Sequence, residues 1–401
     1  MWVPRQDMLE DMCHGFVGGT GFASDISAGL EVQFLNESGI GSGVRRDWLN
    51  SMMASMLDPQ TGLFEAADGG HTWQPCPLAH MQDQHVVYFE MLGRAMGMAL
   101  LHGEVLPGAH FTPNFLKLLL GQPAKLDDLR GNPPLLTFLK QLAAGQFKPE
   151  ELCLTFSCAN GLGPEADLIP EGSQVEVDST NWQDYYKHMV AFKLHKSIQR
   201  EVEAVKKGLQ HFVDERTMKL LHRYATPQIL DQLLAGESGV DVEDWQAYTL
   251  YKNCSEHNHV VKWFWEILQG YSQKQLQALL AFVTCSPVPP AGGFARLAGF
   301  NGGRHLFELC LLPEHDDSRL PRAATCFNTL YLPSYSSKQV MHHRLQQASS
   351  AQLVFDEGAV HEVAAPRSST TSRASATSSN SSQRSSHWQD MAIEDPSFLT
   401  F

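Results

Sequence analysis

The spacing of apolar residues divides the chain into a long, mostly helical part and a shorter part in which helices and strands alternate. Apolar residues that recur every three to four positions are typical of amphipathic helices. Helices are predicted at 5–13, 80–101, 115–120, 135–143, 186–212, 260–268, 273–283 and 336–348. Alternation with a period of two predicts strands at 30–34, 152–158, 175–177, 305–312 and 329–332. The pattern therefore predicts an α+β fold.

A change in this pattern suggests where the chain divides. The polar string Lys252–Asn258 lacks periodicity, and we interpret it as a linker. We therefore expect a first lobe at 1–252, a hinge at 253–258 and a second lobe at 259–360.

The last forty or so residues, 361–401, differ in kind from the rest. Within them, 366–386 holds ten serines, three threonines and three arginines, without an acidic or large apolar residue. Such a segment cannot bury enough surface to offset the entropy lost on ordering. We predict that this tail is disordered.

Composition narrows the functional classes. The chain has 401 residues, enough for two or three domains, and a formal net charge of −14, which argues against a general nucleic-acid binder. Its eight cysteines lack paired metal-ligand spacing. With no secretory leader and no apolar run long enough to span a bilayer, we expect a soluble protein of the cytoplasm or nucleus. No cofactor, metal, nucleic acid or membrane partner is expected.

One cysteine stands in a distinctive setting. Cys326 lies between a polar approach and the short predicted strand Thr329–Leu332, with Pro321 before it and Pro333 after it. Because proline is poorly tolerated inside strands, the thiol is expected on a short loop that enters the strand. A lone cysteine is more often a packing residue. Its neighbours decide between these interpretations.

Several stretches resemble one family. Residues 320–337 contain LP, a few variable residues, TCFN and then LP-x-Y-x-S, which is similar to the signature around the catalytic cysteine of HECT-type ubiquitin ligases. Val44–Trp48 resembles the V-x-R-[ED]-W opening of that domain, and Phe89–Ala99 resembles its F-x-x-x-G-R-x-x-G-x-A helix. With the WFW helix at 263–265, the resemblance spans about residues 3–355.

The resemblance implies a bilobal HECT domain, with a mostly helical N-lobe and a smaller α/β C-lobe. It implies that Cys326 carries ubiquitin as a thioester, supported by loop residues Thr325, Phe327 and Asn328. A small β/α subdomain at about 151–235 would dock the conjugating enzyme, with these candidate contacts: Leu194, Phe212, Met218 and Leu221. The implied partners are ubiquitin, a ubiquitin-conjugating enzyme and a protein substrate.

One departure from the family pattern leaves alternatives open. Many HECT members have histidine two residues before the cysteine, where this chain has Ala324. Activation of the thiol is then expected to come from backbone donors of the loop or from a side chain elsewhere. A cysteine protease would need a histidine held beside Cys326. A catalytically inactive HECT-like binding module is the other alternative.

Overall fold

The computed structural model describes residues 2–3, 32–34, 42–159, 165–299 and 303–353. The helix expected at 5–13 and the tail at 361–401 lie outside the described residues. The helices are α2 (Ser42–Leu57), α3 (His85–His102), α4 (Pro113–Leu120), α5 (Pro133–Ala143), α6 (Trp182–Leu194), α7 (Gln199–Leu209), α8 (Glu215–Tyr224), α9 (Pro227–Ala235), α10 (Val242–Ala247), α11 (His259–Gln269), α12 (Gln273–Thr284) and α13 (Lys338–Leu353). The strands are β1 (Trp2–Val3), β2 (Gln33–Phe34), β3 (Phe64–Ala67), β4 (Thr72–Pro75), β5 (Ser157–Cys158), β6 (Ala166–Asp167), β7 (Thr249–Lys252), β8 (Phe307–Leu311), β9 (Arg322–Ala324) and β10 (Thr329–Leu332).

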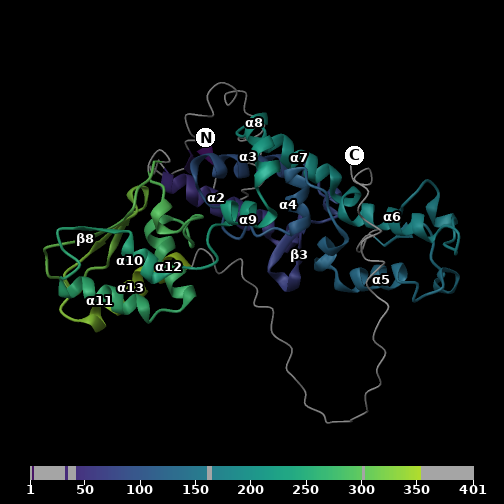
Figure 1. The fold of residues 1–401 in the computed structure, drawn as a ribbon. Coiled ribbons are helices and arrows are strands. Elements are labelled where there is room, and N and C mark those ends of the chain that lie inside the picture. Colours follow the sequence, from purple (N-terminus) through teal and green to yellow (C-terminus); the bar gives the residue numbers. More distant parts are fainter. Residues whose placement is uncertain (1, 4–31, 35–41, 160–164, 300–302, 354–401) are drawn as a thin grey trace, which may run out of the picture.

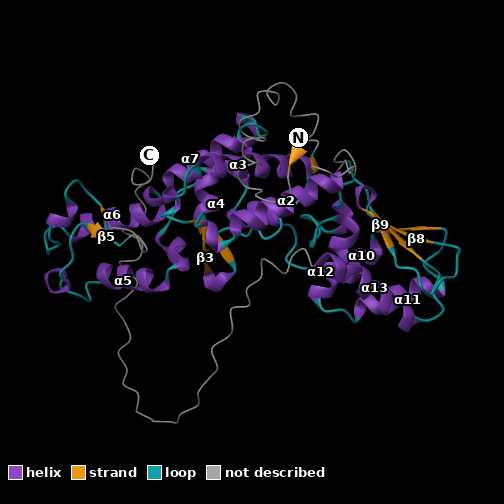
Figure 2. Cartoon of the chain, turned by 180° about the vertical axis from the view of Figure 1, so that it is seen from behind, coloured by secondary structure: helices purple, strands orange, loops and turns teal. Residues whose placement is uncertain are grey.

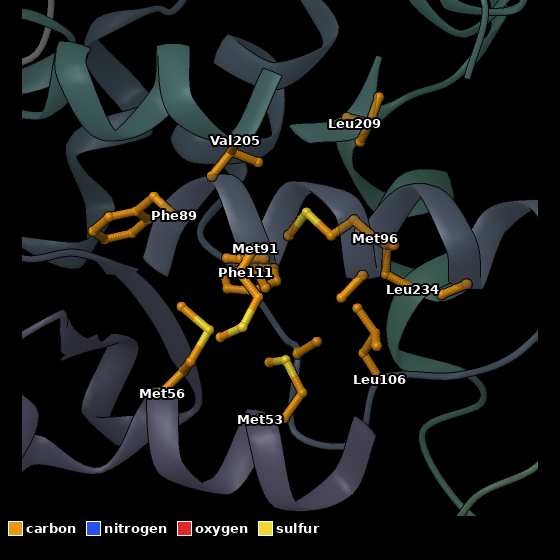
Figure 3. Close-up of a cluster of buried hydrophobic side chains, with 14 of the residues drawn as sticks. Met53, Met56, Phe89, Met91, Met96, Leu106, Phe111, Val205, Leu209 and Leu234 are labelled. Atoms are coloured by element: carbon orange, nitrogen blue, oxygen red, sulfur yellow. The ribbon is translucent and has the colours of Figure 1, made fainter. Parts of the chain in front are cut away.

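The described residues gather around three hydrophobic cores, and the α+β prediction is confirmed. The largest core lies between α2, α3, α4, α7 and α9, and its methionines, leucines and phenylalanines interdigitate (Figure 3). A second core spans Ala124 to Leu194, and a third spans Val240 to Leu345. We call the part up to Ala235 the first lobe and the part from Val240 the second lobe.

The first lobe is built on the close contact between α3 and α7. A Cβ added at Gly208 would meet the backbone of α3, including the nitrogen of Arg94 at 2.7 Å, and one added at Gly93 would meet the backbone of Val205. Only glycine lets two helices approach so closely. Gly93 and Gly208 therefore allow the close packing of α3 on α7.

The single helix expected at 186–212 is two helices. The backbone leaves helical geometry at His195, with φ −137° and ψ −58°, and a short 3-10 turn joins α6 to α7. The buried residues of α6 belong to the core at 124–194, whereas those of α7 belong to the largest core. The apolar spacing continued through the break because the chain passes directly from one core to the other.

The small subdomain is therefore displaced from the predicted range. Its core spans Ala124 to Leu194, and α7, α8 and α9 pack with the largest core instead. The predicted range 151–235 therefore begins too late and ends too late. The subdomain contains α5, α6 and the β5–β6 pair, and it lies at the end of the molecule opposite the second lobe (Figure 1).

The second lobe is a four-stranded sheet covered by helices. The strand order is β7-β8-β10-β9, with β7, β8 and β10 parallel and β9 antiparallel to β10. Helices α11, α12 and α13 lie together beside this sheet (Figure 2). Trp245 of α10 fills the centre, with its ring stacked on Phe294 at 4.9 Å between centroids and edge-on to Phe307 at 5.2 Å.

This sheet corrects the expected hinge. Thr249–Lys252 was placed in the first lobe, but it pairs with β8, and Trp245 and Val240 are buried in the core of the second lobe. The string at 253–258 is the turn between β7 and α11. The chain passes between the cores after Ala235, at 236–239, where Gly236 has φ +83°.

Serine residues cap two helices of the second lobe in different ways. The capping box of Ser272 and Gln275 is present at the start of α12. At α13 the cap is Ser337, whose hydroxyl accepts from the backbone nitrogen of Val340 at 3.3 Å, whereas Ser336 donates to Asp317. Across the described residues, no helix has both the length and the apolar character needed to cross a membrane.

Candidate active site

Cys326 lies where two strands of the second lobe meet. A single 3-10 turn, Thr325–Phe327, connects β9 to β10, and Ala324 pairs with Thr329 across the turn. The thiol is half-buried, and the neighbouring side chain of Phe327 is exposed. The structure thus places the cysteine on a short loop before the predicted strand.

Asn328 anchors this loop from within. It is fully buried, at 0% exposure, and adopts the left-handed conformation with φ +47°. Its Nδ2 donates to the carbonyls of Ala298 at 2.9 Å and His305 at 2.7 Å. Asparagine tolerates this backbone geometry better than most residues. The asparagine of the TCFN motif therefore fixes the turn that carries the thiol.

The first lobe reaches the same loop through α2. Arg46 is buried, at 7% exposure, and its Nη1 donates to the carbonyl of Thr284 at 2.9 Å and to Oδ1 of Asn328 at 3.3 Å. Its Nη2 donates to the carbonyl of Ala298. Burial lowers the pKa of Arg46, and the carboxylate of Glu104 opposes that effect.

The start of α2 lies against the thiol itself. A Cβ placed on Gly43 would lie 3.2 Å from Cβ of Thr325 and 3.7 Å from the sulfur of Cys326. About two turns further along α2, Nδ2 of Asn50 donates to the carbonyl of Cys285 at 2.9 Å. A cavity of about 20 Å³ lies beside Arg46 and Asn50, with room for about one water molecule.

Burial affects the other three cysteines of the second lobe. Burial raises the pKa of Cys285 to about 11, although a hydrogen bond with Thr325 opposes the rise. Burial also raises the pKa of Cys254 and of Cys310, the latter inside β8. Since the thiolate is the nucleophilic form, these three thiols are poor candidates for covalent chemistry.

An imidazole packs on the loop from the approach to β8. The ring of His305 lies 5.9 Å from the ring of Phe327, and its Nδ1 faces the carbonyl of Leu306 at 3.2 Å. This contact puts a histidine against the loop but directs one ring nitrogen toward backbone. Within the part of the chain that the structure describes, no three or more His, Cys, Asp or Glu side chains are grouped to hold a metal ion.

The four candidate docking residues do not form one surface. Leu194 is only 1% exposed and belongs to the core of the small subdomain. Phe212, Met218 and Leu221 pack on the largest core, and Phe212 covers Gly97 of α3. Leu194 is therefore excluded as a docking contact, because a buried side chain cannot meet a partner without unfolding its surroundings.

Sequence reasoning did not assign a role to Gly43, Arg46 or Asn50. The V-x-R-D-W motif contains Arg46, but the pattern alone does not show that α2 packs on a loop about 280 residues later. Only the tertiary contact identifies these residues as part of the site.

Comparison with known proteins agrees with this geometry. A family model described as HECT-domain (ubiquitin-transferase) matches residues 50–356. This chain belongs to the HECT-domain family. It is 33% identical over 338 residues to the E3 ubiquitin-protein ligase Smurf1 of Drosophila melanogaster, covering 81% of this chain and 31% of that protein.

Two further relatives are E3 ubiquitin-protein ligases named HACE1. The chain is 31% identical to the E3 ubiquitin-protein ligase HACE1 of Danio rerio over 325 residues, covering 80% of this chain and 35% of that protein. It is also 31% identical to human HACE1 over 348 residues, covering 86% of this chain and 37% of that protein. The chain thus spans about a third of the length of these curated relatives.

Proposed function

We propose that this HECT domain is a ubiquitin transferase that carries ubiquitin as a thioester on Cys326. The thiolate of Cys326 attacks the carbonyl carbon of the thioester on a ubiquitin-conjugating enzyme, and the cysteine of that enzyme leaves as a thiolate. A substrate lysine amine then attacks the new thioester, loses a proton and expels the thiolate of Cys326. These steps exchange one acyl bond for another and need no oxidant.

The observation that carries this proposal is the position of Cys326. Its half-buried thiol lies on a turn at the edge of the sheet, held by Asn328, while burial raises the pKa of Cys254, Cys285 and Cys310. A thioester intermediate needs a sulfur that a second protein can approach. The turn at Thr325–Phe327 meets that requirement better than the interior of β8.

The conjugating enzyme is proposed to bind the small subdomain at 124–194. This subdomain projects from the first lobe at the end opposite the second lobe (Figure 1). The thiol would therefore have to move toward a bound conjugating enzyme before loading. The connection at 236–239 is the part of the chain between the two cores that could bend.

The direct test is incubation with activating enzyme, conjugating enzyme and ubiquitin. We expect an adduct of ubiquitin that a thiol reductant removes. Cys326→Ala should abolish the adduct, and Cys326→Ser should give a reductant-resistant ester, because an alkoxide leaves less readily than a thiolate. Cys310→Ala is the matched control and should load normally. An adduct that survives in Cys326→Ala would refute the assignment.

A further inference from the structure

At the interface between the lobes, the buried guanidinium of Arg46 forms its hydrogen bonds mostly with the opposite lobe. Arg46 belongs to the first lobe, yet its hydrogen bonds run to Thr284, Ala298 and Asn328 of the second lobe. The neighbouring Arg45 differs. Its guanidinium forms a close pair with Glu104 of its own lobe, with Nη2 and Oε1 2.6 Å apart, whereas Nε of Arg46 is 3.9 Å from the same carboxylate.

Two of the three groups that Arg46 binds also hold the turn of Cys326 in place. The carbonyl of Ala298 accepts from both Arg46 and Asn328, and Oδ1 of Asn328 accepts from Arg46. A guanidinium can serve several acceptors at once because its donors lie in a fixed plane. Arg46 thus joins α2 to Asn328, at the end of the turn that carries Cys326, and to the carbonyl of Ala298 that Asn328 also binds.

This contact also brings α2 against the sulfur. Gly43 lies so close to Thr325 and Cys326 that even a methyl group there would collide with the Thr325 side chain. The side of the thiol that faces α2 is therefore closed to a second protein for as long as the lobes stay in contact.

We propose that Arg46 is a positioning residue that latches the lobes in a closed state and shields Cys326. Release of the latch, with bending at 236–239, would free the thiol for loading. The second part rests on the proposed function, whereas the shielding does not.

The balance of interactions makes such a latch reversible. Opening exposes Arg46 and its carbonyl partners to water, which replaces the lost hydrogen bonds, so the net cost of breaking each bond is modest. Arginine keeps its charge in both states, and Glu104 stays paired with Arg45. An open hollow of about 790 Å³ beside Gly239, Val240 and Asp241 leaves space next to the connection.

The test measures how fast iodoacetamide alkylates Cys326 in the folded protein. Mass spectrometry follows the modification of each cysteine over time. Arg46→Met removes the hydrogen bonds and keeps most of the side-chain volume. We expect alkylation of Cys326 to become about tenfold faster, the size of effect that one hydrogen bond to a charged group can have on an equilibrium. Asn50→Ala, which removes a smaller interlobe bond, should change the rate in the same direction by less.

Two controls distinguish opening of the lobes from unfolding of the protein. Cys310 is buried in the same lobe and should be alkylated at an unchanged rate in Arg46→Met. Arg45→Lys changes the adjacent arginine but keeps a positive charge beside the buried carboxylate of Glu104, and it should leave the rate at Cys326 unchanged. An unchanged rate at Cys326 in Arg46→Met, or equal acceleration at Cys310 or in Arg45→Lys, would overturn the latch.

The same variants distinguish this proposal from the proposed function. If Arg46→Met speeds alkylation but the wild-type protein forms no ubiquitin adduct, the shielding stands and the transferase assignment fails. If the wild-type protein forms the adduct and alkylation is the same in Arg46→Met, the latch fails and the transferase assignment stands.

Discussion

Asn328 holds the thiol loop through contacts that can be removed one class at a time. Its Nδ2 donates two hydrogen bonds, to the carbonyls of Ala298 and His305, and its backbone is in the left-handed region at φ +47°. Asn328→Ala removes both donors within the second lobe, together with the Oδ1 acceptor that Arg46 of the first lobe binds at 3.3 Å, and places a residue with a Cβ and no polar side chain in that conformation. Two hydrogen bonds are worth about 2 kcal/mol in total, and the backbone adds about 1 kcal/mol. We expect the second lobe to lose about 3 kcal/mol of stability.

Two further variants separate the contributions. Asn328→Gly removes the same donors but suits the left-handed backbone, so it should cost about 2 kcal/mol. Asn253 has a similar conformation, φ +58°, at an exposed position of the same lobe. Its Nδ2 also donates a long, weak hydrogen bond to the sulfur of Cys310 at 3.7 Å, so Asn253→Ala should cost the backbone share of about 1 kcal/mol and little more. Because this bond touches the Cys310 probe, the variants are compared by their urea midpoints and not by the rate at which the exposed thiol reacts.

The measurement must report on the second lobe alone, because two lobes need not unfold together. Pulsed alkylation of Cys310 across a urea series does so, since this thiol is buried in β8 and reacts only when the lobe opens. Equal losses for Asn328→Ala and Asn253→Ala would show that the side-chain bonds contribute nothing. That result would refute the view that Asn328 fixes the loop.

Three other predictions test the rest of the molecule. Gly208→Ala should destabilise the first lobe by about 3 kcal/mol in denaturant, because its Cβ meets backbone of α3, whereas Gly270→Ala, with no neighbour closer than 3.5 Å, should have little effect. Burial raises the pKa of the Glu201 carboxyl, so the folded protein is most stable where this group is protonated and loses stability as pH rises. Glu201→Gln should therefore raise the melting temperature by a few degrees near pH ~8. A gain of the same size at pH ~4 would contradict this direction. Val175 is 37% exposed on the small subdomain, and Val175→Glu should slow ubiquitin loading without lowering the melting temperature. Leu220 on α8 is 51% exposed, and Leu220→Glu should load normally. Normal loading of Val175→Glu would exclude Val175 from the docking surface.

Local signals in the sequence were sufficient for many elements. Pro113 and Pro133 begin α4 and α5, and the box of Ser272 and Gln275 begins α12. The turn at Cys326 and the strand after it were also predicted, because proline and alternation act over a few residues. These features depend on neighbours in the chain, which a sequence shows directly.

The prediction of the hinge was wrong because it depended on contacts between residues that are far apart in the sequence. Thr249–Lys252 becomes part of the second lobe by pairing with β8, more than fifty residues later, and parallel pairing leaves no local mark in the sequence. Polarity at 253–258 reflected an exposed turn, which has the same composition as a linker. The break at His195 was missed because one apolar spacing served two different cores in succession.

Helix α2 shows why the site could be predicted only in part. Two adjacent arginines, Arg45 and Arg46, would ordinarily indicate a solvated face, since charged side chains are rarely buried without partners. Both are buried here, because Glu104 pairs closely with Arg45 and lies 3.9 Å from Arg46, and Arg46 also donates to three acceptors of the second lobe. A charge with its compensation on another lobe depends on the arrangement of the lobes, so Arg46 must change its surroundings whenever Cys326 moves away from α2.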